Sequence, residues 1–285
     1  MPEGDTVWRT GRQLDAALAG RTLTRSDFRV PRYATTNLAG REVREVVSRG
    51  KHLLTRVDGD VTVHTHLRMD GSWRIRQATG HPPSDHRVRL VLANAQWQAI
   101  GYLLGVVEVV RTSQEDRVVG HLGPDLLGQD WDQAEAVRRL GELPERPIGE
   151  ALLDQANLAG IGNLYKAEVL FLRGINPWLP VGEVDDLGTV VELARRLLDA
   201  NKGRPAQVTT GNLARGQETW VYGRRGRPCR RCGSPVRAAG YENLFDAGPS
   251  GRSGGLRGVV PPGNRSNANM ERVTFWCPAC QPGKQ

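Results

Sequence analysis

Two Cys-x-x-Cys pairs near the C-terminus restrict the fold of this chain more than any other feature of its sequence. Their members are Cys229, Cys232, Cys277 and Cys280, and the 285 residues contain no other cysteine. Four thiolates at this spacing match the tetrahedral ligand set of a structural Zn²⁺. Paired disulfides are unusual in a reducing compartment, and a redox motif does not need the second pair. We therefore expect one structural zinc ion that joins two distant segments of the chain.

The charge of the chain indicates a polyanionic partner. Lysine and arginine number 39 against 31 aspartates and glutamates, which gives a formal net charge of +8. Of these basic residues 35 are arginines, which bind phosphate in a bidentate manner. The sequence has neither an apolar run long enough to span a membrane nor a signal-peptide core. These features predict an intracellular protein without a membrane partner.

The spacing of apolar residues indicates an α+β protein with two lobes. Residues 5–18 have the spacing of a helix, which Asp5 or Thr6 could cap and Gly20 could end. Short alternating apolar runs between residues 21 and 111, separated by Asp-Gly turn signals, predict a β-sandwich lobe. The second lobe is helical. Its predicted helices span residues 131–140, 148–155, 164–172 and 184–200.

Composition divides the chain into three predicted domains. We expect a β-sandwich domain at residues 1–122, a helical domain at residues 123–215 and a cysteine-containing domain at residues 216–285. Within the third domain, residues 241–269 are rich in Gly, Ser, Pro and Asn. Such a composition is typical of a disordered loop.

Arginine and aromatic residues flank the two cysteine pairs. Residues 221–228 precede the first pair, and residues 270–276 precede the second. We expect these flanks to form a β-hairpin clamped by zinc, with Arg272 near its tip, so that its charges enter a groove with little mobility. A solvated run of charges is the alternative.

The N-terminus begins Met1-Pro2-Glu3. Methionine before so small a residue is normally removed, and Pro2 would then carry a secondary amine. An α-amino group has a reference pKa of about 8, and its neutral form can attack an aldehyde-like carbon to give a Schiff base. Glu3 could move protons during that attack. Many proteins start with Met-Pro, so these residues alone do not separate such chemistry from an ordinary N-terminus.

Three further positions have both a functional and a structural interpretation. Lys51 follows a glycine at the start of a predicted strand, where a solvated surface cation is the usual interpretation. His64 and His66 share one strand face and could bind a metal, but no third ligand has suitable spacing, so we favour a structural role. Met69 at a loop tip either packs on the sandwich or acts as a wedge between unstacked bases.

Glycines punctuate the segment that leads into the third predicted helix. Gly160 and Gly162 allow close backbone approach, and Asn163 could cap the helix and offer its amide to a phosphate. Bare N–H groups and the helix dipole favour anions at such a position. A simple helix cap is the alternative, although the basic charge and the zinc module favour a phosphate site.

Five motifs occur in the same order as in a known family. They comprise residues 1–6, 50–54, 66–71 and 157–163, and the cysteine finger with Arg272. Together they resemble the formamidopyrimidine-DNA glycosylase and endonuclease VIII family of base-excision repair enzymes. Pro-Glu-Gly-Asp rather than Pro-Glu-Leu-Pro places the chain nearer the endonuclease VIII branch. The resemblance implies a β-sandwich lobe with a leading helix, and a helical lobe with a helix-two-turn-helix and a zinc-finger β-hairpin.

The resemblance also implies roles for individual residues. Pro2 resembles the nucleophile that attacks C1′ of the damaged nucleotide, and Glu3 resembles the group that transfers protons during sugar-ring opening. Lys51 corresponds to the lysine that holds a phosphate and donates a proton in β-elimination. Asn163 matches a phosphate-binding asparagine, and Arg272 matches the finger arginine assigned to δ-elimination.

These implications predict a bifunctional DNA glycosylase and AP lyase that removes oxidised bases, pyrimidines in preference to purines, through a Schiff base at Pro2 and cuts the strand by β,δ-elimination. We expect damaged double-stranded DNA as the partner, a monomer, and a bacterial cytoplasmic location at the nucleoid when DNA is bound. The main alternative is a non-catalytic damaged-DNA-binding protein with the same fold, although Pro2, Glu3 and Lys51 together argue against it. An RNA-binding helical module with a zinc ribbon fits the charge but not the N-terminus.

The chain departs from the family pattern in two regions. Residues 241–269 make the segment between the cysteine pairs considerably longer than is usual in the family. Residues 95–112 contain no recognisable arginine-phenylalanine wedge loop, so the other residues that fill the space of an extruded base are not identified.

Overall fold

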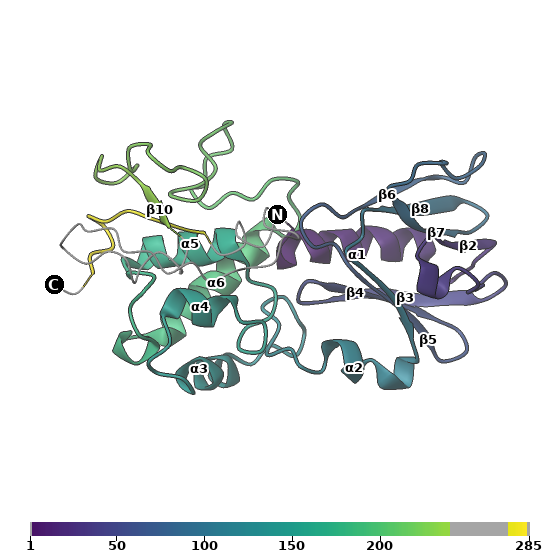
Figure 1. The fold of residues 1–285 in the computed structure, drawn as a ribbon, viewed down its shortest axis with the longest axis horizontal. Helices are drawn as coiled ribbons and strands as arrows, with labels where there is room; N and C mark the ends of the chain where they lie inside the picture. Colours follow the sequence, from purple (N-terminus) through teal and green to yellow (C-terminus); the bar gives the residue numbers. More distant parts are fainter. Residues whose placement is uncertain (1, 240–272, 284–285) are drawn as a thin grey trace, which may run out of the picture. The chain divides into compact units, whose positions relative to one another are not determined.

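The computed structural model describes residues 2–239 and 273–283, which belong to two compact units (Figure 1). The first unit contains Met1–Arg139, Asp154–Ile161 and Arg195–Ala206, and the second contains Leu140–Leu153, Gly162–Ala194 and Gln207–Gln285. The predicted α+β class is confirmed, because the first unit holds the two large sheets and the second is mainly helical with one two-stranded sheet. The division into three domains stays a prediction. The insertion expected at residues 241–269 lies outside the described residues.

The first unit begins with helix α1 (Gly4–Leu18), which contacts strands of two sheets. Its buried side includes Val7, Leu14 and Leu18, spaced at helical intervals. Glu3, rather than Asp5 or Thr6, is the N-cap residue, and it makes no capping hydrogen bond through its side chain. The expected cap is therefore wrong by a few residues, because the helix starts at Gly4, before the residues with good capping side chains.

Two antiparallel sheets form the body of the first unit, so the predicted sandwich is present. The five-stranded sheet has the order β1 (Arg21–Thr22), β3 (Glu42–Arg49), β4 (His52–Val57), β5 (Val61–His66) and β9 (Val106–Val110). The four-stranded sheet has the order β2 (Arg25–Phe28), β7 (Val88–Ala93), β8 (Trp97–Tyr102) and β6 (Ser72–Gln77). Apolar residues of α1 and of both sheets form one hydrophobic core.

The alternation of side chains along β4 and β5 gives the five-stranded sheet two different faces. Leu53 and Val63 belong to the shared core, whereas Arg56 and Thr62 lie on the opposite face. That opposite face bonds to the segment after β9, since Glu115 accepts hydrogen bonds from both Arg56 and Thr62. The segment contains the 3-10 helix η2 (Thr112–Gln114) and the short helix α2 (Asp116–Val119), neither of which was predicted from the sequence. A further 3-10 helix, η1 (Pro31–Tyr33), follows β2.

The four helices predicted from helical spacing are all present, with ends that differ by a few residues. Helix α3 (Gln133–Gly141) begins in the first unit, α4 (Ile148–Leu153) and α5 (Asn163–Arg173) belong to the second, and α6 (Leu187–Asn201) begins in the second and ends in the first. The 3-10 helix η3 (Val181–Glu183) precedes α6. Every residue of α5 from position 163 to 171 is buried, and the helix ends at Gly174 with φ of +69°.

The finger hairpin pairs different strands from those expected. Strand β10 (Arg237–Ala239) follows the first cysteine pair and is antiparallel to β11 (Thr274–Trp276). Residues 221–228 form turns instead of the first strand, because Gly223 and Gly226 have φ of +71° and +75°.

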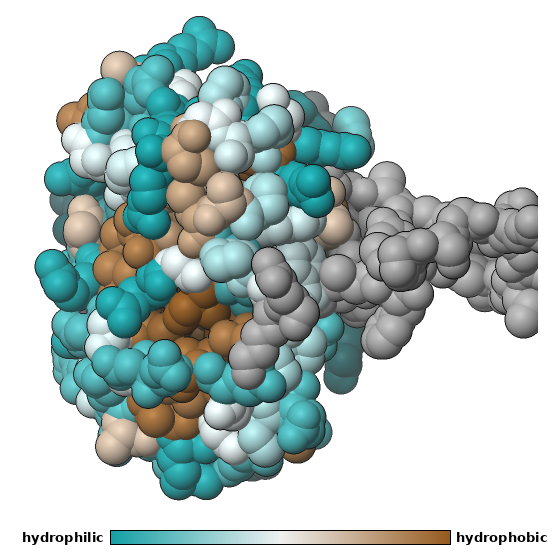
Figure 2. Space-filling view, turned by 90° about the vertical axis from the view of Figure 1, so that its left-hand side faces the viewer, coloured by the Kyte–Doolittle hydropathy of each residue, from teal (hydrophilic) through white to brown (hydrophobic). Residues whose placement is uncertain are grey.

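On the face shown in Figure 2, hydrophilic residues surround a group of apolar ones. Among the described residues, none of the helices combines the length and the apolarity needed to cross a membrane.

Candidate active site and metal centre

A turn at Ala159–Gly160 holds the N-terminal residues in place. The N–H of Gly4 donates a hydrogen bond of 2.8 Å to the carbonyl oxygen of Gly160. A Cβ at position 4 would lie 3.0 Å from the Cα of Gly160, so the close backbone approach depends on glycine. Pro2 and Glu3 come directly before this contact, and Glu3 is fully buried. The start of α1 is therefore held against the backbone of Gly160 within the first unit.

The segment that carries Lys51 packs against the same turn. Gly50 has φ of +56°, and a Cβ there would lie 3.1 Å from the Cβ of Ala159. Lys51 itself is half-buried. The structure thus brings the N-terminal motif and the Gly50-Lys51 motif, which are far apart in the sequence, to one turn of the backbone.

Asp125, which was not identified from the sequence, is bound to both Gly50 and Ala159. Its carboxylate accepts the N–H of Gly50 at 2.8 Å and the N–H of Leu127 at 3.0 Å. Its backbone forms a parallel bridge with Ala159. Only 3% of Asp125 is exposed, and this burial raises the pKa of its carboxyl group. The one local signal was a Gly-Pro-Asp sequence after the sandwich, which resembles an ordinary turn.

Two neighbouring turns carry Met69 and a second apolar residue, Leu103. Met69 lies half-buried in the turn between β5 and β6, beside Arg68 with φ of +51°. The turn between β8 and β9 lies next to it, because the N–H of Gly105 bonds to the carbonyl of His66 at 2.9 Å. Leu103 in that turn has φ of +46° and is 38% exposed. A bulky residue held in the left-handed region is uncommon and often marks a functional position.

Asn163 and Lys166 belong to the second unit and hold the finger strand. The side-chain amide of Asn163 donates to the carbonyl of Val273 at 2.6 Å, and the ammonium of Lys166 donates to the hydroxyl of Thr274 at 2.7 Å. Gly162, rather than Asn163, is the N-cap residue of α5, which corrects the expected cap. Arg272 lies outside the described residues.

Glu168 fixes the loop that leads to the first cysteine pair. Its fully buried carboxylate accepts the backbone N–H groups of Trp220, Val221 and Tyr222 at 2.7–2.8 Å. It also accepts a hydrogen bond from the hydroxyl of Thr209. Three backbone donors and one hydroxyl compensate for the loss of hydration of this buried charge.

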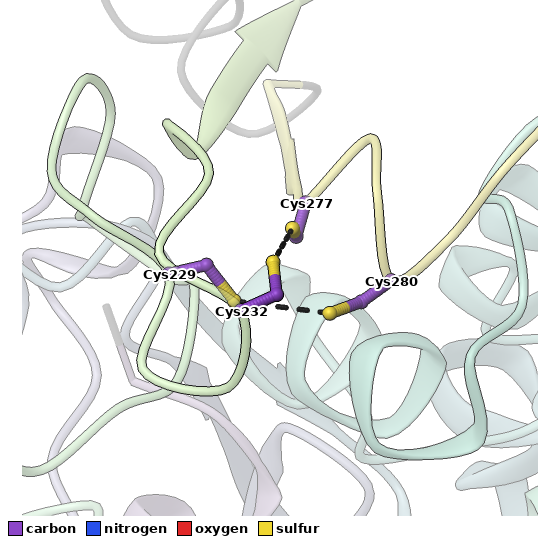
Figure 3. Close-up of side chains that lie close together, drawn as sticks. All are labelled: Cys229, Cys232, Cys277 and Cys280. Atoms are coloured by element: carbon purple, nitrogen blue, oxygen red, sulfur yellow. Dashed lines mark hydrogen bonds between the residues drawn. The ribbon is translucent and has the colours of Figure 1, made fainter.

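The four cysteines form a compact cluster that suits a tetrahedral metal ion (Figure 3). Their Sγ atoms all lie within 4.8 Å of one another, with 4.0 Å between Cys229 and Cys280 and 3.4 Å between Cys232 and Cys277. Bonds of about 2.3 Å to a tetrahedral zinc place sulfurs about 3.8 Å apart, so the cluster fits. Among the described residues this is the one group of metal-ligating side chains with such spacing.

The environment of these thiols differs from one cysteine to the next. Hydrogen bonds with Ser234 lower the pKa of Cys232 to about 6, whereas burial raises the pKa of Cys280 to about 12. Coordination to a metal deprotonates a thiol outright, so both can serve as thiolate ligands. Around the cluster, Cys229 and Cys277 pack in a small core with Phe171 of α5.

Comparison with known proteins places this geometry in a family. The sequence profile of the formamidopyrimidine-DNA glycosylase N-terminal domain matches residues 1–100, and that of the formamidopyrimidine-DNA glycosylase H2TH domain matches residues 122–188. The chain is 53% identical over 289 aligned positions to "Probable endonuclease 8 2" of Streptomyces coelicolor, and the alignment covers 99% of this chain and 95% of that protein. It belongs to the formamidopyrimidine-DNA glycosylase and endonuclease VIII family.

Other relatives agree with the endonuclease VIII branch and with the fold. "DNA-(apurinic or apyrimidinic site) lyase Nei2" of Mycolicibacterium smegmatis is 45% identical, with 99% of each chain covered. The formamidopyrimidine-DNA glycosylase of Latilactobacillus sakei is 32% identical, with 83% of this chain and 92% of that protein covered. A crystal structure of Lactococcus lactis formamidopyrimidine-DNA glycosylase bound to DNA with an AP site has a TM-score of 0.75 at 24% identity, with 99% of this chain and 100% of that chain covered. The family predicted from the sequence is confirmed, and with it the class of enzyme, a DNA glycosylase and AP lyase.

Proposed function

We propose that this member of the family excises oxidised pyrimidines from damaged double-stranded DNA and cuts the strand by β,δ-elimination. One observation carries the proposal: the Pro2-Glu3 terminus and the Gly50-Lys51 segment are held against the same turn at Ala159–Gly160. A protein that only binds DNA has no need to fix a terminal amine, a buried carboxyl group and a lysine in one place. The main alternative, a non-catalytic damaged-DNA-binding protein, does not account for this arrangement.

The reaction would begin at the amine of Pro2 after removal of Met1. The neutral nitrogen attacks C1′ of the extruded nucleotide, the bond from C1′ to the base breaks, and the base leaves with a proton. Glu3 moves the protons needed to open the sugar ring and form the cationic iminium. Extrusion of the base costs a few kcal/mol, and contacts between the basic protein and phosphates offset that cost.

The iminium then makes the hydrogen on C2′ acidic. Loss of that proton expels the 3′ phosphate, and Lys51 is the residue that exchanges protons at this step in our proposal. A second elimination, assisted by Arg272, expels the 5′ phosphate. We assign Asn163 to a phosphate contact, and Met69 together with Leu103 to the space that the extruded base leaves. The paired turns and the exposed apolar surface of Leu103 support the last assignment.

The cysteine cluster would hold one structural zinc ion. Its sulfur spacing and its position beside β10 and β11 support this assignment. Cys229, Cys232, Cys277 and Cys280 would be the ligands, and a bound ion would fix both strands of the hairpin. The fully buried Glu168 and Lys166 attach the same region to α5, so the finger would act as a rigid extension of that helix.

Borohydride trapping on an oligonucleotide with an AP site tests the chemistry. We expect wild-type protein that lacks Met1 to form a covalent adduct, and Pro2→Gly to form little or none while it still binds DNA. An N-terminal tag left in front of Pro2 should have the same effect as Pro2→Gly. DNA binding without any adduct in zinc-loaded, Met1-free protein would instead establish the non-catalytic alternative. A panel of duplexes with oxidised pyrimidines or oxidised purines measures the substrate preference directly.

A further inference from the structure

A small polar pocket opens beside the turn that holds Leu103. Its walls come from the turn after β5, strand β6, the segment before β7 and the end of β8. Charged, aromatic and apolar side chains line it, among them Asp70, Arg74, Asp85, Arg87, Tyr102 and Leu103. Its volume of about 230 Å³ is below the roughly 300–1,000 Å³ of sites for drug-sized ligands, so it suits a single ring system.

The pocket adjoins the two apolar residues that we assign to the space of the extruded base. Leu103 itself lines the pocket, and Asp70 directly follows Met69 in the chain. The N–H of Leu103 also donates a hydrogen bond of 2.8 Å to the carbonyl oxygen of Arg87. A ligand in the pocket therefore lies beside Leu103. In a duplex with one base extruded, the base left without its pairing partner is next to the vacated space.

Arg74 places a cation in this pocket without an ion pair. Its guanidinium lies over the ring of Tyr102, with 5.2 Å between its central carbon and the ring centre. Within the described part of the chain, neither Arg74 nor Asp70 forms an ion pair. Stacking on an aromatic ring restricts the planar guanidinium and leaves N–H groups at its edge available. The pocket thus offers an oriented double donor and an unpaired carboxylate.

The second arginine of the pocket is already neutralised. The carboxylate of Asp85 accepts hydrogen bonds from Nε and Nη2 of Arg87 at 2.7–3.1 Å. This pair forms a wall without net charge, so Arg74 and Asp70 are the charges left to bind a ligand. A phosphate would be attracted by Arg74 but repelled by Asp70. A neutral ligand that has both hydrogen-bond acceptors and donors fits the two side chains better.

We propose that this pocket binds a guanine that lies opposite the extruded nucleotide. Arg74 donates to O6 and N7 of the guanine, which is the commonest specific contact of arginine with a base. Asp70 accepts a hydrogen bond from the N2 amino group. Adenine has an amino group in place of O6, so the donors of Arg74 would face another donor.

Guanine is the pairing partner of cytosine, so the pocket would direct the enzyme towards oxidised cytosines. This inference rests on the proposed excision of oxidised pyrimidines and on the assignment of Met69 and Leu103 to the vacated space. It adds a specificity for the base on the strand that is not cut.

Binding to duplexes that cannot be cleaved tests the pocket without any chemistry. Each duplex carries a tetrahydrofuran analogue of the AP site opposite G, A, C or T, and fluorescence anisotropy gives Kd at one fixed salt concentration. We expect the wild type to bind the guanine duplex about tenfold more tightly than the adenine duplex, as for one bidentate arginine contact. Equal affinities for the four duplexes, or a preference for another base, would overturn the proposal.

Two variants assign the preference to its side chains. Arg74→Lys keeps the charge but loses the planar double donor, so we expect it to lose the guanine preference while its affinity for the adenine duplex changes by less than about twofold. Inosine lacks the N2 amino group of guanine. The wild type should therefore bind an inosine duplex more weakly than the guanine duplex, whereas Asp70→Ala should bind both equally.

Arg44→Lys is the matched control for Arg74→Lys. Arg44 belongs to β3 in the other sheet and 70% of its side chain is exposed, so this variant should keep the guanine preference. If Arg74→Lys weakened binding to all four duplexes by the same factor, Arg74 would contact a phosphate and the proposal would be refuted.

Borohydride trapping separates failure of the pocket from failure of the proposed function. With saturating protein and an AP site opposite adenine, Arg74→Lys should form the Pro2 adduct at the wild-type rate, because the pocket then has no guanine to bind. A wild type that forms the adduct but binds the four duplexes equally would refute the guanine pocket alone. A wild type that prefers guanine but forms no adduct would refute the proposed chemistry and support the pocket.

Discussion

Gly50→Ala tests whether the turn at Ala159–Gly160 sets the position of Lys51. An alanine at φ of +56° costs about 1–2 kcal/mol in backbone strain. Its Cβ would also lie 3.1 Å from the Cβ of Ala159, and over-packing of this kind costs about 1–3 kcal/mol. We therefore expect the free energy of unfolding to fall by about 2–5 kcal/mol.

Gly20→Ala is the matched control for this variant. Gly20 has φ of +68° and no atom within 4 Å of an added Cβ. In Gly20→Ala the free energy of unfolding should therefore fall only by the backbone strain, about 1–2 kcal/mol. Urea unfolding measures both losses, and cleavage of an AP site at a temperature where both variants are folded measures activity. Because the backbone before Lys51 must move by a few tenths of an ångström, we expect cleavage by Gly50→Ala to fall about tenfold and that by Gly20→Ala to stay unchanged. If Gly50→Ala and Gly20→Ala lost the same unfolding free energy and cleaved the AP site at the same rate, the Ala159–Gly160 turn would not set the position of Lys51.

Three other predictions concern the second unit and the paired histidines His52 of β4 and His66 of β5. Glu168→Gln should lower the free energy of unfolding by about 1.5–3 kcal/mol in urea titrations, because the amide replaces a carboxylate that accepts buried N–H groups. Cys277→Ser should abolish zinc binding measured by atomic absorption, while the helices keep their circular dichroism signal. The free energy of unfolding should fall as pH drops from 6.5 towards 4, because the pKa values of His52 (about 3) and His66 (about 4) in the folded state lie below the ordinary 6.5, so the unfolded chain binds more protons in that window. His52→Gln should reduce this dependence of the free energy of unfolding on pH. An unchanged dependence would contradict the lowered pKa of His52 as its cause.

The sequence predicted those elements whose burial follows a regular period. Helix α1 was found from its spacing because Val7, Leu14 and Leu18 recur at helical intervals on its buried side. The finger hairpin was misplaced because the arginine-rich segment before the first cysteine pair has no strand alternation to test, and Gly223 and Gly226 turn it instead. Leu103 and Asp125 were missed for a different reason. Their roles arise from contacts with residues far away in the sequence, which no local pattern records.

The motif glycines nevertheless carried information about those distant contacts. Gly4, Gly50 and Gly160 belong to three separate motifs, and each lacks a side chain where another backbone segment passes. The N–H of Gly4 bonds to the carbonyl of Gly160, and a Cβ at Gly50 would lie 3.3 Å from the nitrogen of Gly160. Each glycine therefore has a packing reason that needs no contact with DNA. The short motifs that resemble the family describe one three-dimensional contact. The residues proposed for chemistry, Pro2 and Lys51, adjoin close backbone approaches that the carboxylate of Asp125 helps to hold.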